Sequence, residues 1–143
     1  MLIIEDNHTN FTTPLDILEK ISSKFTNREI ELIIIDSLTM QNMNATYRGQ
    51  NSPTDVLSFP LEGDFMPLGS IVISIDFVYQ KAKFFKHSSE NEFTLLFIHG
   101  LLHLLGFDHE VDNGEMRREE EDIINTFSLP TSLIVRTIIK TID

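Results

Sequence analysis

The segment SENEFTLLFIHGLLHLLGFDH, residues 89–109, determines more about the fold than any other stretch of this 143-residue chain. Apolar residues lie on almost every side of the helix that it would form, which indicates a helix buried in the core. Ser89 and Glu92 have the spacing of an N-terminal capping box, and Gly106 suits the end of a helix. We therefore expect a long, mostly buried helix over residues 89–105.

Shorter strands and helices are expected around this segment. Strands are predicted at residues 2–5, 29–36, 56–59 and 69–75, and helices at residues 13–25, 37–47, 76–87 and 113–127. The second strand is an almost continuous apolar run, typical of a strand buried on both faces. Strands early and helices late predict one α+β domain over residues 1–143, with a small mixed β-sheet packed with helices. The extension at residues 128–143 is ambiguous in structure.

Composition restricts the function. The chain has no cysteine, so histidine and carboxylate are the only strong zinc ligands available. The net charge of -11 is opposite to that usual for nucleic-acid proteins, so a nucleic-acid function here needs a local basic patch or a metal. The first residues show no secretory signal, and no apolar stretch is long enough to span a bilayer. We expect a cytoplasmic protein with no membrane partner.

Three histidines in residues 99–109 have the spacing of metal ligands. His99 and His103 are four residues apart, which places both on one face of the expected helix. His109 follows the predicted helix end at Gly106 and can return as a third ligand. Three ligands leave one tetrahedral position open, as in catalytic zinc sites. A structural zinc is the alternative, with Asp108 or Glu110 as the fourth ligand.

The spacing matches the metzincin protease pattern HExxHxxGxxH except at one position. Gly100 replaces the glutamate that acts as general base in those proteases. A glycine within a helix costs about 1 kcal/mol relative to alanine, so its presence suggests that substrate or backbone passes close to the helix there. The substitution disfavours a peptidase.

Other segments occur in order with the histidine motif. They are Tyr47-Arg48-Gly49, Thr54-Asp55-Val56-Leu57-Ser58-Phe59-Pro60 and Leu68-Gly69-Ser70-Ile71-Val72-Ile73-Ser74, followed by the motif that ends in Asp108-His109-Glu110. With them, over residues 44–121, the chain resembles the bacterial YbeY family, the metal-dependent endoribonucleases of ribosomal RNA maturation. One departure is Ser70, where the family commonly has aspartate.

The resemblance implies a single zinc ion (Zn2+) on His99, His103 and His109, and a functional role for Arg48. It also implies cleavage of single-stranded RNA, processing of the 3′ end of small-subunit ribosomal RNA, and ribosome quality control. The implied partners are ribosomal RNA and the ribosome or its small-subunit proteins, with no DNA substrate.

The residues themselves are suited to phosphodiester chemistry. Arg48 offers a planar, permanently charged donor fork that fits a phosphate. A zinc ion with an open position would activate water opposite it. Asp55 and Asp108 are the candidate proton acceptors, although Asp108 could instead orient a ligating imidazole.

Two other functions stay open at this stage. One is a zinc peptidase-like hydrolase, and the other is a non-catalytic ribosome-associated factor whose zinc is structural. Outside the histidine motif, residues 119–122 are expected to form a solvated acidic face, and His8 and His87 are expected at the surface.

Overall fold

The computed structural model describes residues 2–6, 9–51, 54–63, 66–108, 113–134 and 136. Four strands form one sheet in the order β1 (Leu2–Asp6), β2 (Ile30–Ile35), β4 (Gly69–Ser74) and β3 (Val56–Pro60). The first three run parallel, and β3 lies antiparallel to β4 at the edge. The expected mixed sheet is confirmed, and so are its four strands, with ends shifted by at most one residue.

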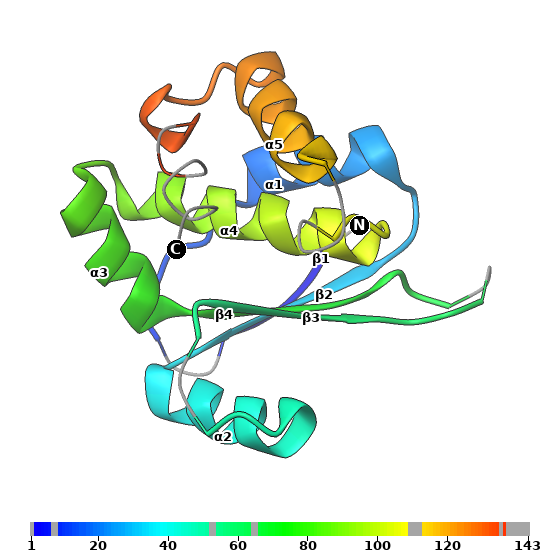
Figure 1. Ribbon diagram of the computed structural model, residues 1–143, viewed down its shortest axis with the longest axis vertical. Coiled ribbons are helices and arrows are strands. Elements are labelled where there is room, and N and C mark those ends of the chain that lie inside the picture. The colour runs from blue at the N-terminus through cyan, green and yellow to red at the C-terminus, as the bar shows by residue number, and fades with distance from the viewer. Residues whose placement is uncertain are drawn as a thin grey trace.

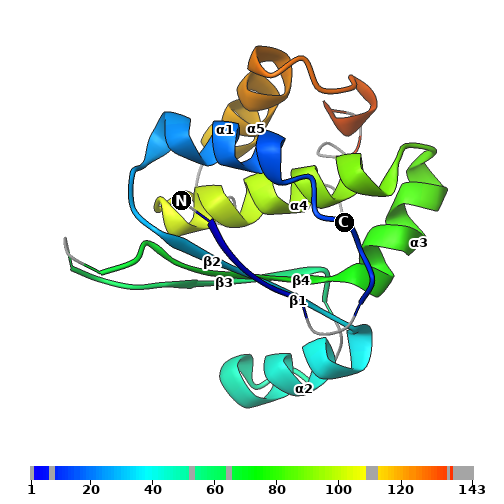
Figure 2. The same cartoon turned by 180° about the vertical axis from the view of Figure 1, so that it is seen from behind.

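Among the described residues, five helices of 11 to 16 residues cover the sheet unequally. They are α1 (Leu15–Phe25), α2 (Ser37–Arg48), α3 (Ile75–Phe85), α4 (Ser89–Leu104) and α5 (Glu115–Thr126). Helix α4 crosses one face of the sheet, and α1 and α5 lie on its outer side (Figures 1 and 2). Helix α2 lies alone against the opposite face. The α+β class expected from the sequence is confirmed.

The alternation of side chains along the strands separates two apolar cores. Ile71 and Ile73 of β4 face α4 and belong to the main core, which includes Phe97 and Leu101. Val72 faces the other way and packs with Met40 of α2 in a smaller core. Strand β2 contributes to both cores, so the prediction of a strand buried on both faces is confirmed.

For helix α4, the predicted C-terminal end is confirmed, whereas the predicted N-terminal cap is wrong. Ser88, not Ser89, is the N-cap, and its Oγ accepts a hydrogen bond from the Asn91 amide at 3.1 Å. The capping box is wrong because the Glu92 side chain is fully buried and binds Arg136 instead. At the other end, Gly106 (φ 101°) follows the last turn, and the Phe107 amide donates to the Leu102 carbonyl at 2.9 Å. This is a Schellman ending, so the stop predicted at Gly106 is confirmed.

The described part of the C-terminal extension packs back onto the domain. Residues 132–134 are helical, and Leu133 is buried against Leu95 of α4 and Ile124 of α5. Arg136 is 3% exposed. Within the part of the chain that the structure describes, no helix has both the length and the apolar character needed to cross a membrane.

Candidate active site

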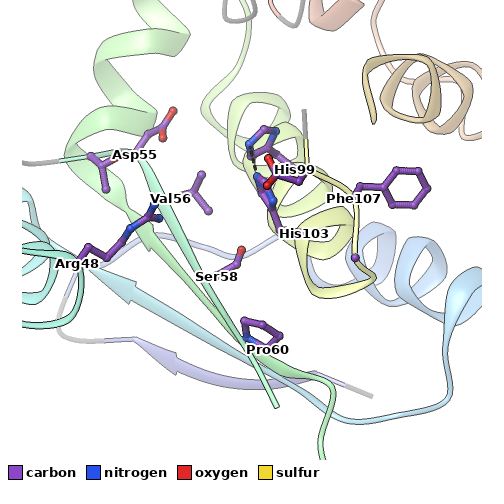
Figure 3. Close-up of a pocket in the computed structure, with 11 residues that line it drawn as sticks. Arg48, Asp55, Val56, Ser58, Pro60, His99, His103 and Phe107 are labelled. Carbon is purple, nitrogen blue, oxygen red and sulfur yellow. Dashed lines mark hydrogen bonds between the residues drawn. The ribbon is translucent and has the colours of Figure 1, made fainter. Parts of the chain in front are cut away.

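A pocket of about 470 Å³ lies where the last turns of α4 pass the edge strand β3 (Figure 3). Its walls come from three parts of the chain: the end of α2, the segment leading into and along β3, and α4 with the turn after it. The lining residues are Arg48, Thr54, Asp55, Val56, Ser58, Pro60, His99, His103, Gly106, Phe107 and Asp108. The predicted site residues within the described ranges therefore meet in one cavity.

His99 and His103 are adjacent on the face of α4 that lines this pocket. Their Nε2 atoms are 3.1 Å apart, and their ring planes are nearly perpendicular at 79°. Two nitrogen ligands at about 2.0–2.1 Å from a tetrahedral metal lie about 3.3 Å from each other. The distance is compatible with a shared metal ion, and the prediction that both histidines lie on one face of the helix is confirmed.

Glu120 of α5 orients His99 from behind. Its Oε1 accepts a hydrogen bond from His99 Nδ1 at 2.8 Å, and both side chains are at most 10% exposed. This contact holds the proton on Nδ1, which leaves the Nε2 lone pair facing the pocket. The prediction of a solvated acidic face is wrong for Glu120. The four-residue spacing from buried Met116 and the buried Ile123 and Ile124 place it on the inner stripe of α5, and that pattern could have revealed it.

The third expected ligand cannot be placed in the same way. His109 and Glu110 lie outside the described residues. Among the residues that the structure does describe, no three His, Cys, Asp or Glu side chains are grouped as a metal site. The three-histidine site remains a prediction, supported by the pair on α4.

Arg48 reaches the pocket from the opposite side of the sheet. It is the last residue of α2, which ends because Gly49 adopts the left-handed conformation (φ 69°). Helix α2 and helix α4 lie on different faces of the sheet, so the Arg48 side chain passes around the edge strand β3 (Figures 1 and 3). Within the described ranges, the exposed guanidinium makes no hydrogen bond or ion pair, so its donors are available to a ligand.

Asp55 is held by a buried cluster at the back of the pocket. Its Oδ2 lies 3.6 Å from Nη2 of Arg136, and the same guanidinium contacts both oxygens of Glu92 at 3.1–3.3 Å. The expected surface position of His87 is wrong, because its side chain is 3% exposed and its Nε2 lies 2.8 Å from Glu92. Phe85 packs under the Arg136 guanidinium at 4.8 Å. The C-terminal extension thus contacts the pocket wall through Arg136, which pairs with the lining residue Asp55.

Comparison with known proteins gives the family of the chain. The family model described as endoribonuclease YbeY matches residues 4–128. The chain belongs to the YbeY family. Relatives named endoribonuclease YbeY include one from a Sulfurovum species, 56% identical over 94% of this chain and 97% of its own length. Another, from Aliarcobacter butzleri, is 58% identical over 92% of this chain and 96% of its own length.

A solved structure also has this fold. The solution structure of TM1509 from Thermotoga maritima covers 100% of this chain and 96% of its own, with a TM-score of 0.60 and 25% identity. The resemblance read from residues 44–121 is therefore confirmed, and it extends over nearly the whole YbeY domain.

Packing explains why residue 100 is a glycine. This is the position at which the histidine helix of this chain departs from the metzincin pattern. A Cβ at Gly100 would lie 2.8 Å from Ile71 Cγ2 and 3.2 Å from Ser58 Oγ. Ser58 Oγ also donates to the Gly100 carbonyl at 3.2 Å. The expectation that another group passes close to the helix at this glycine is confirmed, and that group is the sheet. An approach of substrate is therefore not needed to explain the glycine. A side chain as large as glutamate has no space there.

The departure at Ser70 also has a structural context. Ser70 shares the face of β4 occupied by Val72, which points away from α4, and its hydroxyl donates to Glu31 at 2.8 Å. It is not among the residues that line the pocket. No carboxylate role is required at this position for the site described above.

Proposed function

We propose that this chain is a zinc-dependent endoribonuclease that cleaves single-stranded RNA in the pocket between α4 and β3. The observation that carries the proposal is that the paired Nε2 atoms of His99 and His103 line the same cavity as the Arg48 guanidinium. A phosphodiester can bind both a metal and an arginine fork, whereas a peptide bond has no anionic group for the fork. Membership of the YbeY family supports the same activity.

Each residue has a defined task in this proposal. His99 and His103, with His109 as the third ligand, would hold one zinc ion. A zinc ion on three protein ligands lowers the pKa of bound water to about 7 and polarises a phosphoryl oxygen. Glu120 keeps the His99 ring in the ligating tautomer. Arg48 binds a non-bridging phosphate oxygen pair and neutralises the charge that develops during cleavage.

Among the described residues, Asp55 and Asp108 are the carboxylates that line the cavity, and one of them would accept the proton from the attacking nucleophile. Oδ2 of Asp55 lies 3.6 Å from the Arg136 guanidinium, so this carboxylate already has a cationic partner in the protein. Asp108 follows the Schellman turn and is exposed. We assign the proton-accepting role to Asp108 and a supporting role to Asp55.

The biological setting proposed is ribosomal RNA maturation in the cytoplasm. The family resemblance supports processing of the small-subunit RNA 3′ end and ribosome quality control, with ribosomal RNA and small-subunit proteins as partners. A peptidase is disfavoured because the sheet fills the space beside Gly100 where a glutamate base would need to stand.

The test is RNA cleavage by pure protein. Wild type, His99→Ala and Arg48→Ala should be assayed on one labelled single-stranded RNA after metal removal and after zinc is restored. We expect cleavage only by zinc-loaded wild type. Equal cleavage by all three proteins would indicate a contaminating nuclease and would leave a non-catalytic factor with a structural zinc as the better reading.

A further inference from the structure

The side chain that precedes Arg48 is an aromatic ring largely open to solvent. Tyr47 is 67% exposed, and it is one of only two tyrosines in the chain. Its ring packs edge-on against Phe59, with the centroids 5.6 Å apart and the planes at 70°. An edge-on contact fixes the ring's orientation while it leaves a ring face uncovered.

Tyr47 lies next to the pocket both through its own helix, α2, and through its contact with strand β3. On α2, the following residue is Arg48, which lines the cavity. On β3, Phe59 lies between the lining residues Ser58 and Pro60. Side chains alternate along a strand, so Phe59 faces α2 while Ser58 and Pro60 face α4. The Tyr47 ring therefore lies just around the edge strand from the cavity, with Arg48 reaching between the two.

This placement matches what an unpaired nucleotide requires. Proteins bind single-stranded RNA by stacking its bases on aromatic side chains and by contacting the adjacent phosphates with cations. An acidic protein has particular need of stacking, because stacking does not depend on net positive charge. A base in a duplex has both faces covered by its neighbours and cannot use such a ring.

We propose that Tyr47 is a stacking platform for the base that flanks the phosphate bound by Arg48. The inference rests on the proposed RNA-cleaving function, and it adds to that function a nucleobase subsite on the α2 side of β3. It also gives a physical reason for a single-strand preference, since only an unpaired base can leave the cavity and fold around the strand edge onto the ring.

Tyr79 provides a matched control within the same chain. It is 45% exposed on α3 and packs edge-on against Phe11 at 6.2 Å and 71°. It is not among the pocket-lining residues. Because the chain has no tryptophan, Tyr79→Phe leaves Tyr47 as the only strong intrinsic fluorophore, and Tyr47→Phe leaves Tyr79.

The first experiment titrates both variants with a short single-stranded 2′-O-methyl RNA, whose integrity is checked on a gel afterwards. We expect the Tyr47 emission to be quenched at saturation and the Tyr79 emission to change only by the light absorbed by the RNA itself. The matched duplex should quench neither. Equal quenching of the two tyrosines, or quenching of Tyr47 by the duplex to the same extent, would overturn the proposal.

The second experiment measures cleavage kinetics. Tyr47→Ala should raise KM for single-stranded RNA by at least about fivefold with kcat within about twofold, whereas the control Tyr79→Ala should leave both unchanged. Tyr47→Phe, which keeps an aromatic ring, should raise KM less than Tyr47→Ala does. Selective quenching of Tyr47 in a protein that cleaves no RNA would keep the subsite and reject the nuclease. Cleavage that is insensitive to Tyr47→Ala, with no selective quenching, would keep the nuclease and reject the subsite.

Discussion

Nδ1 of His99 lies 2.8 Å from Oε1 of Glu120, although the two residues are 21 positions apart and belong to different helices. The contact makes α5 part of the candidate active site, because the Nε2 lone pair of His99 faces the pocket only while Nδ1 keeps its proton. Loss of the negative charge at residue 120 should therefore lower the affinity for zinc more than it lowers the stability of the fold.

Glu120→Gln should weaken zinc binding by about 10- to 100-fold, since the neutral amide is a poorer acceptor for the His99 N–H. Zinc affinity is measured by competition with a chromophoric chelator, and unfolding by urea titration. Glu119→Gln is the matched control, because Glu119 precedes it on α5 and is not buried. Equal zinc affinity in the two variants would show that Glu120 does not orient the ligand.

Gly100→Ala should destabilise the protein even though alanine favours helix by about 1 kcal/mol. The new Cβ would lie 2.8 Å from Ile71 Cγ2, and overpacking of this kind costs about 1–3 kcal/mol. Gly100→Glu should be more destabilising still and should produce no peptidase activity. Urea unfolding and a casein-release assay check the two statements. A folded Gly100→Glu variant with zinc-dependent peptidase activity would contradict them.

The elements built from local patterns were predictable, and the contacts between elements were not. The spacing of His99 and His103 on one helix face determines that their rings meet, so the pair could be predicted from the sequence alone. Arg48 was placed in the site only through family resemblance. Its path around β3 depends on α2 packing against the far face of the sheet, which no local pattern shows.

The predictions that were wrong also depended on contacts that a local pattern does not show. Ser88 and Ser89 can both cap a helix, and a local rule cannot choose between them. The Glu92 side chain does not cap the helix, because Arg136, 44 residues later, gives its carboxylate a buried partner. Long-range ion pairing thus overrides the short-range rule. The same buried carboxylate also draws in His87, five residues earlier, whose ring nitrogen Nε2 lies 2.8 Å from it.

Asp36→Ala should cost about 0.5–2 kcal/mol at neutral pH, because Asp36 caps α2 through the Thr39 amide at 2.7 Å. Hydrogen bonds from Thr39 lower the pKa of Asp36 below its usual 3.8. A carboxyl with a depressed pKa stabilises the fold above pH 3.8, and this stabilisation is lost as the pH falls through the folded-state pKa. Urea unfolding at several pH values should therefore show the difference between wild type and variant shrinking in acid. A difference that grows in acid would contradict this.

Arg136→Met should destabilise the protein by roughly 3–5 kcal/mol, because it leaves the fully buried Glu92 carboxylate without its guanidinium partner. The double variant Arg136→Met, Glu92→Gln should recover much of that loss, since no unpaired buried charge remains. Urea unfolding of both variants checks the pair. If the double variant is no more stable than the single one, the extension is held by packing at Leu133 rather than by the ion pair.

Arg48→Ala should reduce cleavage of single-stranded RNA by about 100-fold or more, the usual consequence of losing one donor that stabilises developing charge. Zinc content and melting temperature should stay unchanged, because the Arg48 side chain is exposed and makes no ion pair within the described residues. Arg48→Lys should recover only part of the activity, since an ammonium keeps the charge but lacks the fork. Cleavage of one labelled RNA by each variant provides the measurement.

Arg118→Ala is the control for loss of positive charge alone, because Arg118 is exposed on α5 and is not among the pocket-lining residues. Salt dependence separates the two arginines further. If binding relies on one or two phosphates, log K for single-stranded RNA should fall with log salt at a slope of about -0.7 to -1.4, and Arg48→Ala should reduce that slope by about 0.7. A steep slope that neither variant changes would mean that the -11 chain holds RNA through a basic surface elsewhere, and Arg48 would then not be the phosphate-binding residue.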